Sequence, residues 1–203
     1  MEYDSHHTYL PNHPVYRRDK NTTKIHQVFN EAAQSKYGPN LNEVLGTGPN
    51  LNPDLLSTTM RFRMNRYAWV ADIEKAFLNI ALQSTDVEAI GYLWSTESSK
   101  IGSSLIALKW KRVPFGLSSS PFLLRATVNK HIKCVRSRFT GTVGQLMEQL
   151  YVDDYLGGTD SIEAAKQRVK EINTLLKKTR LNMRSSENFW KKKGLENQTI
   201  GLF

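Results

Sequence analysis

The stretch Tyr151-Val152-Asp153-Asp154 places two adjacent carboxylates at the end of an apolar run. The run covers residues 146–152, includes Leu, Met, Tyr and Val, and predicts a buried strand. Residues 153–155 predict a tight turn, and residues 155–158, with two glycines, predict the returning strand of a β-hairpin. Because neighbouring carboxylates repel each other and resist desolvation, this arrangement favours a site that holds a cation.

A third carboxylate lies near the end of a second apolar run. Residues 67–73 (YAWVADI) predict another buried strand, which carries Asp72. Mg²⁺ takes oxygen ligands and commonly binds one or two protein carboxylates together with substrate phosphates. If Asp72, Asp153 and Asp154 meet on neighbouring strands, they suit a two-metal site that activates an attacking oxygen and stabilises a leaving one. The alternative for the Asp153-Asp154 pair alone is a solvated turn, because Asp favours turns.

Two further elements follow from capping residues and apolar spacing. Asp54 predicts the N-cap of a short helix that runs through Arg63. Ser120 at the N-cap and Pro121 at the first helical position predict the start of a longer helix. Its expected buried stripe consists of Leu124, Val128, Ile132 (or His131), Val135 and Phe139.

The remaining chain predicts one more strand and one more helix. Residues 105–113 are mostly apolar and predict the strand. Residues 159–178 predict the helix, and Asp160 with Glu163 three residues later predicts its capping box. The expected buried stripe of this helix consists of Ile162, Ala165, Val169, Ile172 and Leu176. After residue 178 the chain is basic and predicts irregular structure.

The composition favours a polyanionic partner. The 203 residues carry 28 Lys and Arg against 19 Asp and Glu, a net charge of +9. This charge indicates nucleic acid first and an anionic membrane surface second, and a membrane-surface or protein-binding module has only the charge in its favour. The single cysteine, Cys134, excludes an internal disulfide and fits a reducing, intracellular compartment. Neither a secretory signal nor an apolar run of about 18 residues is present, so no membrane span is expected.

Three motifs occur in an order that resembles reverse transcriptases. Residues 72–77 (DIEKAF), 113–122 (VPFGLSSSPF) and 151–154 (YVDD) are similar to motifs A, B and C of these enzymes. Flanking blocks resemble the BEL/Pao type of LTR retrotransposon, and they comprise residues 9–15, 41–42, 48–55 and 61–63. The resemblance runs from Tyr9 to Ser186 and so covers most of the chain.

The resemblance implies an α+β fold of the right-hand polymerase type. Residues 1–66 are expected to form a fingers-like region, and residues 67–186 a palm that contains motifs A, B and C. The palm is expected to consist of an antiparallel sheet with helices packed on one face. Residues 187–203 are expected to form a basic C-terminal tail, and a thumb is expected to be absent.

The resemblance also implies roles for individual residues. Asp72, Asp153 and Asp154 match the catalytic, metal-binding aspartates. The residues expected to bind the incoming nucleotide are Ile73, Ala76, Phe77, Phe115 and Gly116. Phe77 matches the aromatic gate that rejects a ribose 2′-hydroxyl. The residues expected to lie against nucleic acid are Pro121, Arg125 and Tyr151, since the basic face of the helix after Pro121 is expected to reach phosphates.

The implied function is template-directed addition of deoxynucleotides to a DNA primer 3′-hydroxyl by two-metal phosphoryl transfer. The implied cofactor is Mg²⁺, with Mn²⁺ as an alternative. The implied partners are an RNA or DNA template, a DNA primer and deoxynucleoside triphosphates. A cytoplasmic or retrotransposon-particle location without membrane association is expected, and the sequence defines no oligomeric state.

Two departures from the family pattern favour an alternative. His26 stands where the family usually carries an Arg that contacts the triphosphate, and Asn30 stands where it usually carries Asp. Because His is shorter than Arg and mostly neutral at pH 7, weaker nucleotide binding is expected. The alternative function is a catalytically silent retrotransposon remnant that only binds nucleic acid.

Overall fold

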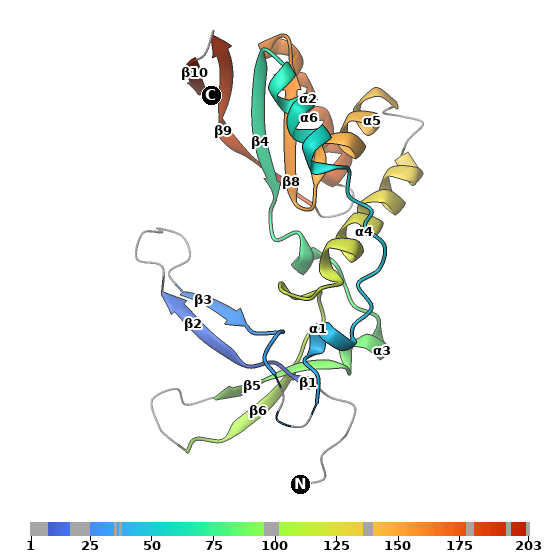
Figure 1. Cartoon of the computed structure of the whole chain (residues 1–203), viewed down its shortest axis with the longest axis vertical. Helices are drawn as coiled ribbons and strands as arrows, with labels where there is room; N and C mark the ends of the chain where they lie inside the picture. Colours follow the sequence, from blue (N-terminus) through green and yellow to red (C-terminus); the bar gives the residue numbers. More distant parts are fainter. Residues whose placement is uncertain are drawn as a thin grey trace. The chain divides into compact units, whose positions relative to one another are not determined.

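The computed structural model describes residues 8–16, 25–34, 36, 38–95, 102–135, 140–177, 181–193 and 196–201 (Figure 1). The chain forms two compact units, each built from two separate segments. Unit 1 comprises Met1–Gly48 and Ile80–Ser120, and unit 2 comprises Pro49–Asn79 and Pro121–Phe203. This division differs from the three consecutive regions expected at 1–66, 67–186 and 187–203, because the chain passes between the units more than once.

Unit 1 contains two small sheets. In the first, β1 (Thr8–Tyr9) pairs parallel with β5 (Ile90–Ser95), which pairs antiparallel with β6 (Leu105–Lys109). In the second, β2 (Asn12–Tyr16) pairs antiparallel with β3 (Ile25–Phe29). The strand predicted at 105–113 is therefore confirmed up to Lys109, and Arg112 forms an isolated bridge with Ala81.

The core of unit 1 joins these sheets to the short helix α1 (Leu41–Val44), while a second short helix, α3 (Ser84–Val87), contacts β5 outside that core. Its buried members are Leu10, Leu41, Ile90 and Leu117. Phe29 packs against this cluster and meets Trp110 edge-on, with ring centroids 4.9 Å apart. Such edge-to-face aromatic contacts add to the stabilisation that burial itself provides.

Unit 2 is built on a five-stranded antiparallel sheet with the strand order β10-β9-β4-β8-β7. The strands are β4 (Tyr67–Ile73), β7 (Leu150–Tyr151), β8 (Asp154–Thr159), β9 (Met183–Lys193) and β10 (Glu196–Gly201). The strand predicted at 67–73 and the β-hairpin predicted around Asp153 are confirmed. The prediction of irregular structure after residue 178 was wrong, because β9 pairs with β4 and β10 pairs with β9.

A large side chain, Trp69, and a glycine, Gly157, lie opposite each other on two neighbouring strands of this sheet. Trp69 on β4 is fully buried and faces Gly157 on β8 across the strand pair. A Cβ at Gly157 would lie 2.3 Å from the Trp69 ring, so only glycine fits there. Tyr155 is also fully buried, and its ring centroid lies 6.0 Å from that of Trp69.

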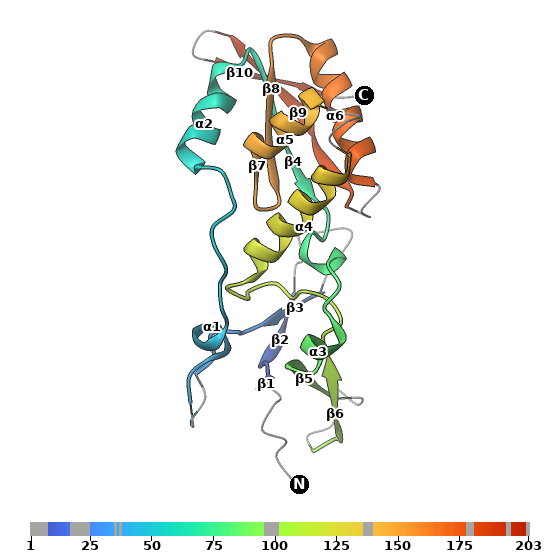
Figure 2. The same cartoon turned by 90° about the vertical axis from the view of Figure 1, so that its right-hand side faces the viewer.

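Helices of unit 2 pack on one face of the sheet (Figures 1 and 2). They are α2 (Leu55–Met64), α5 (Thr140–Gln149) and α6 (Ile162–Lys177), all of which contact β8. The α+β class, with an antiparallel sheet covered by helices, is thus confirmed. No helix in the described residues is long and apolar enough to cross a membrane.

The predicted helices are present, with changes at their ends. Asp54 caps α2 as predicted, accepting a hydrogen bond from the Ser57 amide at 2.7 Å. Helix α6 begins later than predicted, because Ser161 rather than Asp160 accepts the cap bond, from the Ala164 amide at 3.2 Å. In α6 the predicted positions that are buried are Ala165, Ile172 and Leu176.

Helix α4 (Ser120–Val135) has the predicted buried stripe at Leu124, Val128 and Ile132. The Phe139 position of that stripe and the side chain of Val135 lie outside the described residues.

The strand predicted over 146–152 is wrong for residues 146–149, which form the last turn of α5. Leu146 and Leu150 are four residues apart and both fully buried, so the apolar run follows helical spacing until the strand begins.

Candidate active site

The three aspartates meet at one end of the β4–β8 strand pair. Asp72 and Asp154 are directly opposite each other in the antiparallel register. Directly opposite residues share one face of a sheet and lie roughly 5 Å apart at Cβ. Asp153 occupies the turn between β7 and β8, and its carbonyl accepts a hydrogen bond from the Ile73 amide at 2.9 Å. The strand register thus brings the backbone of Asp72 beside that of Asp153 and Asp154, which follow it by 81 and 82 residues in the sequence.

The electrostatics of this cluster favour a cation. Partial burial raises the pKa of the Asp154 carboxyl, and the negative charges of Asp153 and Asp72 raise it further. In the described part of the chain, no three Asp, Glu, His or Cys side chains converge into a ready-made metal-binding group. Asp72 and Asp154 are nevertheless exposed, so rotation about their side-chain bonds is open to them. Their oxygen donors fit a hard divalent cation such as Mg²⁺.

Backbone strain is concentrated beside these aspartates. Among the described non-glycine residues, positive φ values occur only at Lys75 (51°) and Val152 (55°). Lys75 follows Asp72 by three positions, and Val152 directly precedes Asp153. Left-handed conformations are rare for branched side chains and tend to persist at functional sites, where the surrounding structure imposes them.

The expected nucleotide contacts of motif A are buried. Ile73, Ala76 and Phe77 are 2%, 1% and 8% exposed. The side chains of Ile73 and Ala76 therefore pack inside unit 2. Phe77 lies at the start of a single 3₁₀ turn, η1 (Phe77–Asn79), that follows the strained Lys75.

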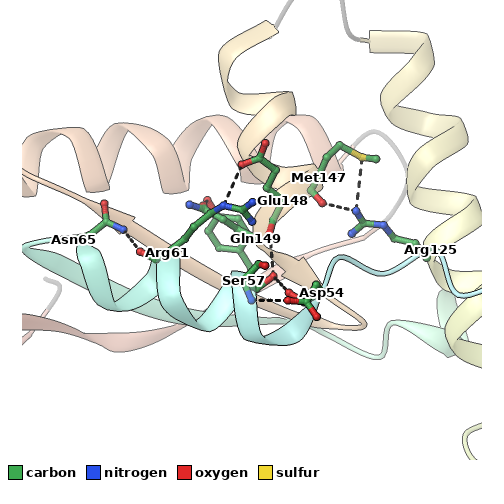
Figure 3. Close-up of polar contacts among 10 residues, drawn as sticks. Asp54, Ser57, Arg61, Asn65, Arg125, Met147, Glu148 and Gln149 are labelled. Atoms are coloured by element: carbon green, nitrogen blue, oxygen red, sulfur yellow. Dashed lines mark hydrogen bonds and ion pairs between the residues drawn. The ribbon is translucent and has the colours of Figure 1, made fainter.

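Arg125 on α4 does not occupy the exposed position expected of a phosphate contact. Its side chain is only 2% exposed, and its Nη1 donates to the Leu150 carbonyl at 2.8 Å. Its Nη2 donates to the Met147 carbonyl (Figure 3). The guanidinium therefore satisfies carbonyls at the end of α5 and the start of β7, which are orphan acceptors at a helix C-terminus. Arg125 supports the strand that leads to Asp153 and Asp154.

The two other expected nucleic-acid contacts are half-buried. Pro121 is the second residue of α4, and Tyr151 on β7 pairs with Asp154 on β8. Tyr151 thus directly adjoins the aspartate cluster through the sheet, whereas Pro121 lies in the first turn of its helix.

Phe115 and Gly116 belong to unit 1, where they form the motif B turn (residues 114–118). Phe115 is 50% exposed, and Gly116 has a φ of 91°, which glycine adopts freely. The amide of Asn42 closes the turn, because its Nδ2 donates to the Gly116 carbonyl at 2.9 Å and its Oδ1 accepts from the Ser118 amide at 2.8 Å.

Two asparagines contact the motif B turn and the turn that carries Asp153, and the sequence did not reveal these contacts. Asn42 lies 76 residues from Ser118, and Asn52 accepts a hydrogen bond from the amide of Val152, 100 residues away. Both asparagines lie in turn-rich sequence, where Asn is usually explained by local turn formation. The only sequence signal was their position within the two flanking blocks at 41–42 and 48–55 that resemble retrotransposon enzymes.

A comparison with protein families identifies the family of this chain. The family model described as "Reverse transcriptase (RNA-dependent DNA polymerase)" matches residues 16–186. The chain therefore belongs to the reverse transcriptase family, whose members are RNA-directed DNA polymerases. No curated protein matches the chain.

Solved foamy virus structures share the fold. The foamy viral protease-reverse transcriptase in complex with an RNA/DNA hybrid has a TM-score of 0.58 and 17% identity over 88% of this chain. A CSH mutant of the prototype foamy virus enzyme has a TM-score of 0.59 and 16% identity over 94% of this chain. The native form has a TM-score of 0.57 and 15% identity over 94% of this chain. The chain covers 20% of the first protein and 24% of each of the other two.

Proposed function

We propose that this chain adds deoxynucleotides to a DNA primer along an RNA or DNA template, as a BEL/Pao-type reverse transcriptase domain. The observation that carries the proposal is the register of β4 and β8, which sets Asp72 opposite Asp154 with Asp153 beside them. A chain of the reverse transcriptase family with an intact carboxylate cluster has the donor groups that nucleotidyl transfer requires.

In this mechanism Asp72, Asp153 and Asp154 would hold divalent cations, Mg²⁺ or Mn²⁺. When bound, such cations activate the primer hydroxyl and offset the charge on the reacting phosphate. The protein contributes mainly by positioning these carboxylates, because phosphoryl transfer needs little covalent chemistry from side chains. The Ile73–Asp153 hydrogen bond and Arg125 support the segments that carry them.

We also propose that Phe77 excludes ribonucleotides, on the strength of its position five residues after Asp72 in motif A. Its burial fits a rigid aromatic surface rather than a mobile side chain. Primer extension with ATP in place of dATP measures this selectivity. Equal use of both nucleotides by the wild-type chain would rule out the gate.

Primer extension tests the proposed function. The chain is incubated with an RNA template, a DNA primer, deoxynucleotides and Mg²⁺ or Mn²⁺, beside the Asp153→Asn and Asp154→Asn variants. Extension is expected from the wild type and to fall by about 10²–10³-fold or more in both variants, because each loses a charged ligand. The matched control is Asp160→Asn, an exposed aspartate beyond the end of β8, which is expected to keep wild-type activity.

Binding of the RNA/DNA hybrid at several salt concentrations separates the two functions left open by the sequence. The +9 charge predicts binding that weakens with salt in all four proteins. Salt-sensitive binding without extension by the wild type would establish the silent remnant. Equal extension by wild type and Asp154→Asn would show that the site assignment is wrong.

A further inference from the structure

The turn that carries the aspartates has an unfavourable residue at its first position. Tyr151 and Asp154 are paired across β7 and β8, so Val152 and Asp153 are the two central residues of a hairpin turn. Val152 has a φ of 55°, whereas Asp153 is absent from the positive-φ residues, which corresponds to a II′-type turn. Glycine is preferred at that first position, and a β-branched residue there is a conformational outlier.

The amide of Val152 is free of the strand ladder, because in a two-residue hairpin loop the ladder bonds connect the flanking residues. Its hydrogen bond goes instead to the side chain of Asn52, whose Oδ1 lies 3.1 Å from the Val152 nitrogen. An acceptor fixed at this point favours the left-handed conformation, since the amide points toward Asn52 in the folded turn.

The backbone at Asn52 is itself held in place. The backbone amide of Asn52 donates to Asn50 Oδ1 at 3.0 Å, and Asp54, the N-cap of α2, follows two residues later. Thr58 on α2 is fully buried, and its hydroxyl lies 2.9 Å from the Asp54 carbonyl and 3.2 Å from the Glu148 carbonyl on α5. Figure 3 shows this junction, where the start of α2 lies against the end of α5.

These contacts connect the asparagine to the strand that leads into the turn. Helix α5 ends at Gln149, directly before β7, and Arg125 binds carbonyls at that junction. Asn52 and the incoming strand are therefore anchored to the same helix end. The outgoing side of the turn is fixed by the bond from Ile73 to Asp153.

We propose that Asn52 is a positioning residue, which holds Val152 in the left-handed conformation that sets Asp153 and Asp154 beside Asp72. This inference rests on the proposed function, because it gives Asn52 a role in presenting the catalytic carboxylates. Asn52 acts through the Val152 amide and touches no reacting group.

Two nearly isosteric substitutions test the role of the acceptor. Asn52→Leu removes the acceptor oxygen, and Asn52→Asp retains it. We expect Asn52→Leu to lower kcat for primer extension by about 10–100-fold with less than about a threefold change in KM for the nucleotide, because misplaced catalytic groups lose rate rather than binding. Asn52→Asp is expected to restore most of the rate. Asn173→Leu on α6 is the matched control and is expected to behave as wild type.

Amide hydrogen exchange measured by NMR tests the Val152–Asn52 hydrogen bond without an activity assay. The Val152 amide is expected to exchange about tenfold faster in Asn52→Leu than in wild type or Asn52→Asp, while the Trp69 amide on β4 keeps its wild-type rate. A parallel rise at Trp69 would show global destabilisation and overturn a local role. An unchanged Val152 exchange rate in Asn52→Leu would also overturn the inference.

The two readouts separate failure of the inference from failure of the proposed function. A wild-type chain that extends no primer, but whose Val152 exchange responds to Asn52→Leu and not to Asn52→Asp, would refute the function and keep the positioning contact. Full extension by Asn52→Leu would refute the positioning role and leave the function intact.

Discussion

Two turns, the motif B turn of unit 1 and the aspartate turn (residues 151–154) of unit 2, reach the left-handed region by opposite means. Gly116 has a φ of 91° and carries no side chain, whereas Val152 has a φ of 55° and a branched one. Each turn is held by a distant asparagine, Asn42 or Asn52. In the first turn the residue type suits the conformation, and in the second the surroundings impose it. The strained turn is the one that carries the carboxylates.

The space beside the two turns also differs. A Cβ at Gly116 would lie between 2.1 and 2.7 Å from three carboxyl atoms of Glu31. Glu31 is 7% exposed, and within the described residues its Oε1 has no hydrogen-bond partner. A buried carboxyl therefore fills the place of the missing side chain, and the glycine is required for space as well as for conformation.

The largest effect is expected from Gly116→Ala. The new Cβ meets both an unfavourable φ and the Glu31 carboxyl, so the free energy of unfolding of unit 1 is expected to fall by about 3 kcal/mol. Denaturant unfolding followed through Trp110 fluorescence measures the change. The control is Gly144→Ala in α5, where a Cβ meets nothing within 4 Å and a gain of about 1 kcal/mol is expected. Equal stability of Gly116→Ala and wild type would remove the contrast between the turns.

A smaller, pH-dependent effect is expected from Glu31→Gln. Burial raises the pKa of the Glu31 carboxyl, with its own backbone amide opposing the rise. A raised pKa means that the folded state holds the proton more tightly than the unfolded state, so wild-type stability falls as the pH rises above the ordinary range of a glutamate. We therefore expect the variant to be more stable than wild type by about 1 kcal/mol at pH 7.5 and to differ less at pH 4. Unfolding curves at both pH values measure this, and a larger difference at pH 4 would contradict it.

An effect similar in size to that of Glu31→Gln is expected from Val152→Gly. Relief of the left-handed strain is of order 1–3 kcal/mol, but glycine also gains about 0.4–1 kcal/mol of freedom in the unfolded chain. The free energy of unfolding of unit 2 is therefore expected to rise by roughly 1 kcal/mol, opposite in sign to Gly116→Ala. Thermal unfolding measures the difference. A clear loss of stability would mean that Val152 is not strained in solution.

Local sequence patterns predicted the helices and strands that are specified by neighbouring residues. The limits of β4 and the Asp54 cap of α2 follow from neighbouring residues, and so do the two runs that end in aspartates. The start of β7 was misplaced, because Leu146 and Leu150 fit a helix as well as a strand. Strand β9 was missed, because residues 184–188 and 191–193 are all polar and the strand is specified by pairing with β4.

The candidate site shows the same limit. The placement of the aspartates at neighbouring strand ends was predicted, because carboxylates that follow apolar runs are visible in the sequence. The roles of Asn52, Asn42 and Arg125 were not, since each depends on a backbone group far away in the chain. A basic residue on a helix predicts an exposed face, and only the structure shows that the Arg125 guanidinium is directed inward to two carbonyls.

The interleaving of the two units has a consequence for synthesis. The chain crosses between them after Gly48, Asn79 and Ser120, so neither unit is a continuous stretch. During translation β4 emerges with Asp72 long before β8, and residues 80–120 leave the ribosome between these partners. All residues of unit 1 are synthesised by Ser120, so this unit can fold first. Strand β4 can pair only later, because its partners β8 and β9 lie beyond Ser120. The aspartate cluster therefore forms only after β7 and β8 have been synthesised, and β4 has no partner in its own sheet before then.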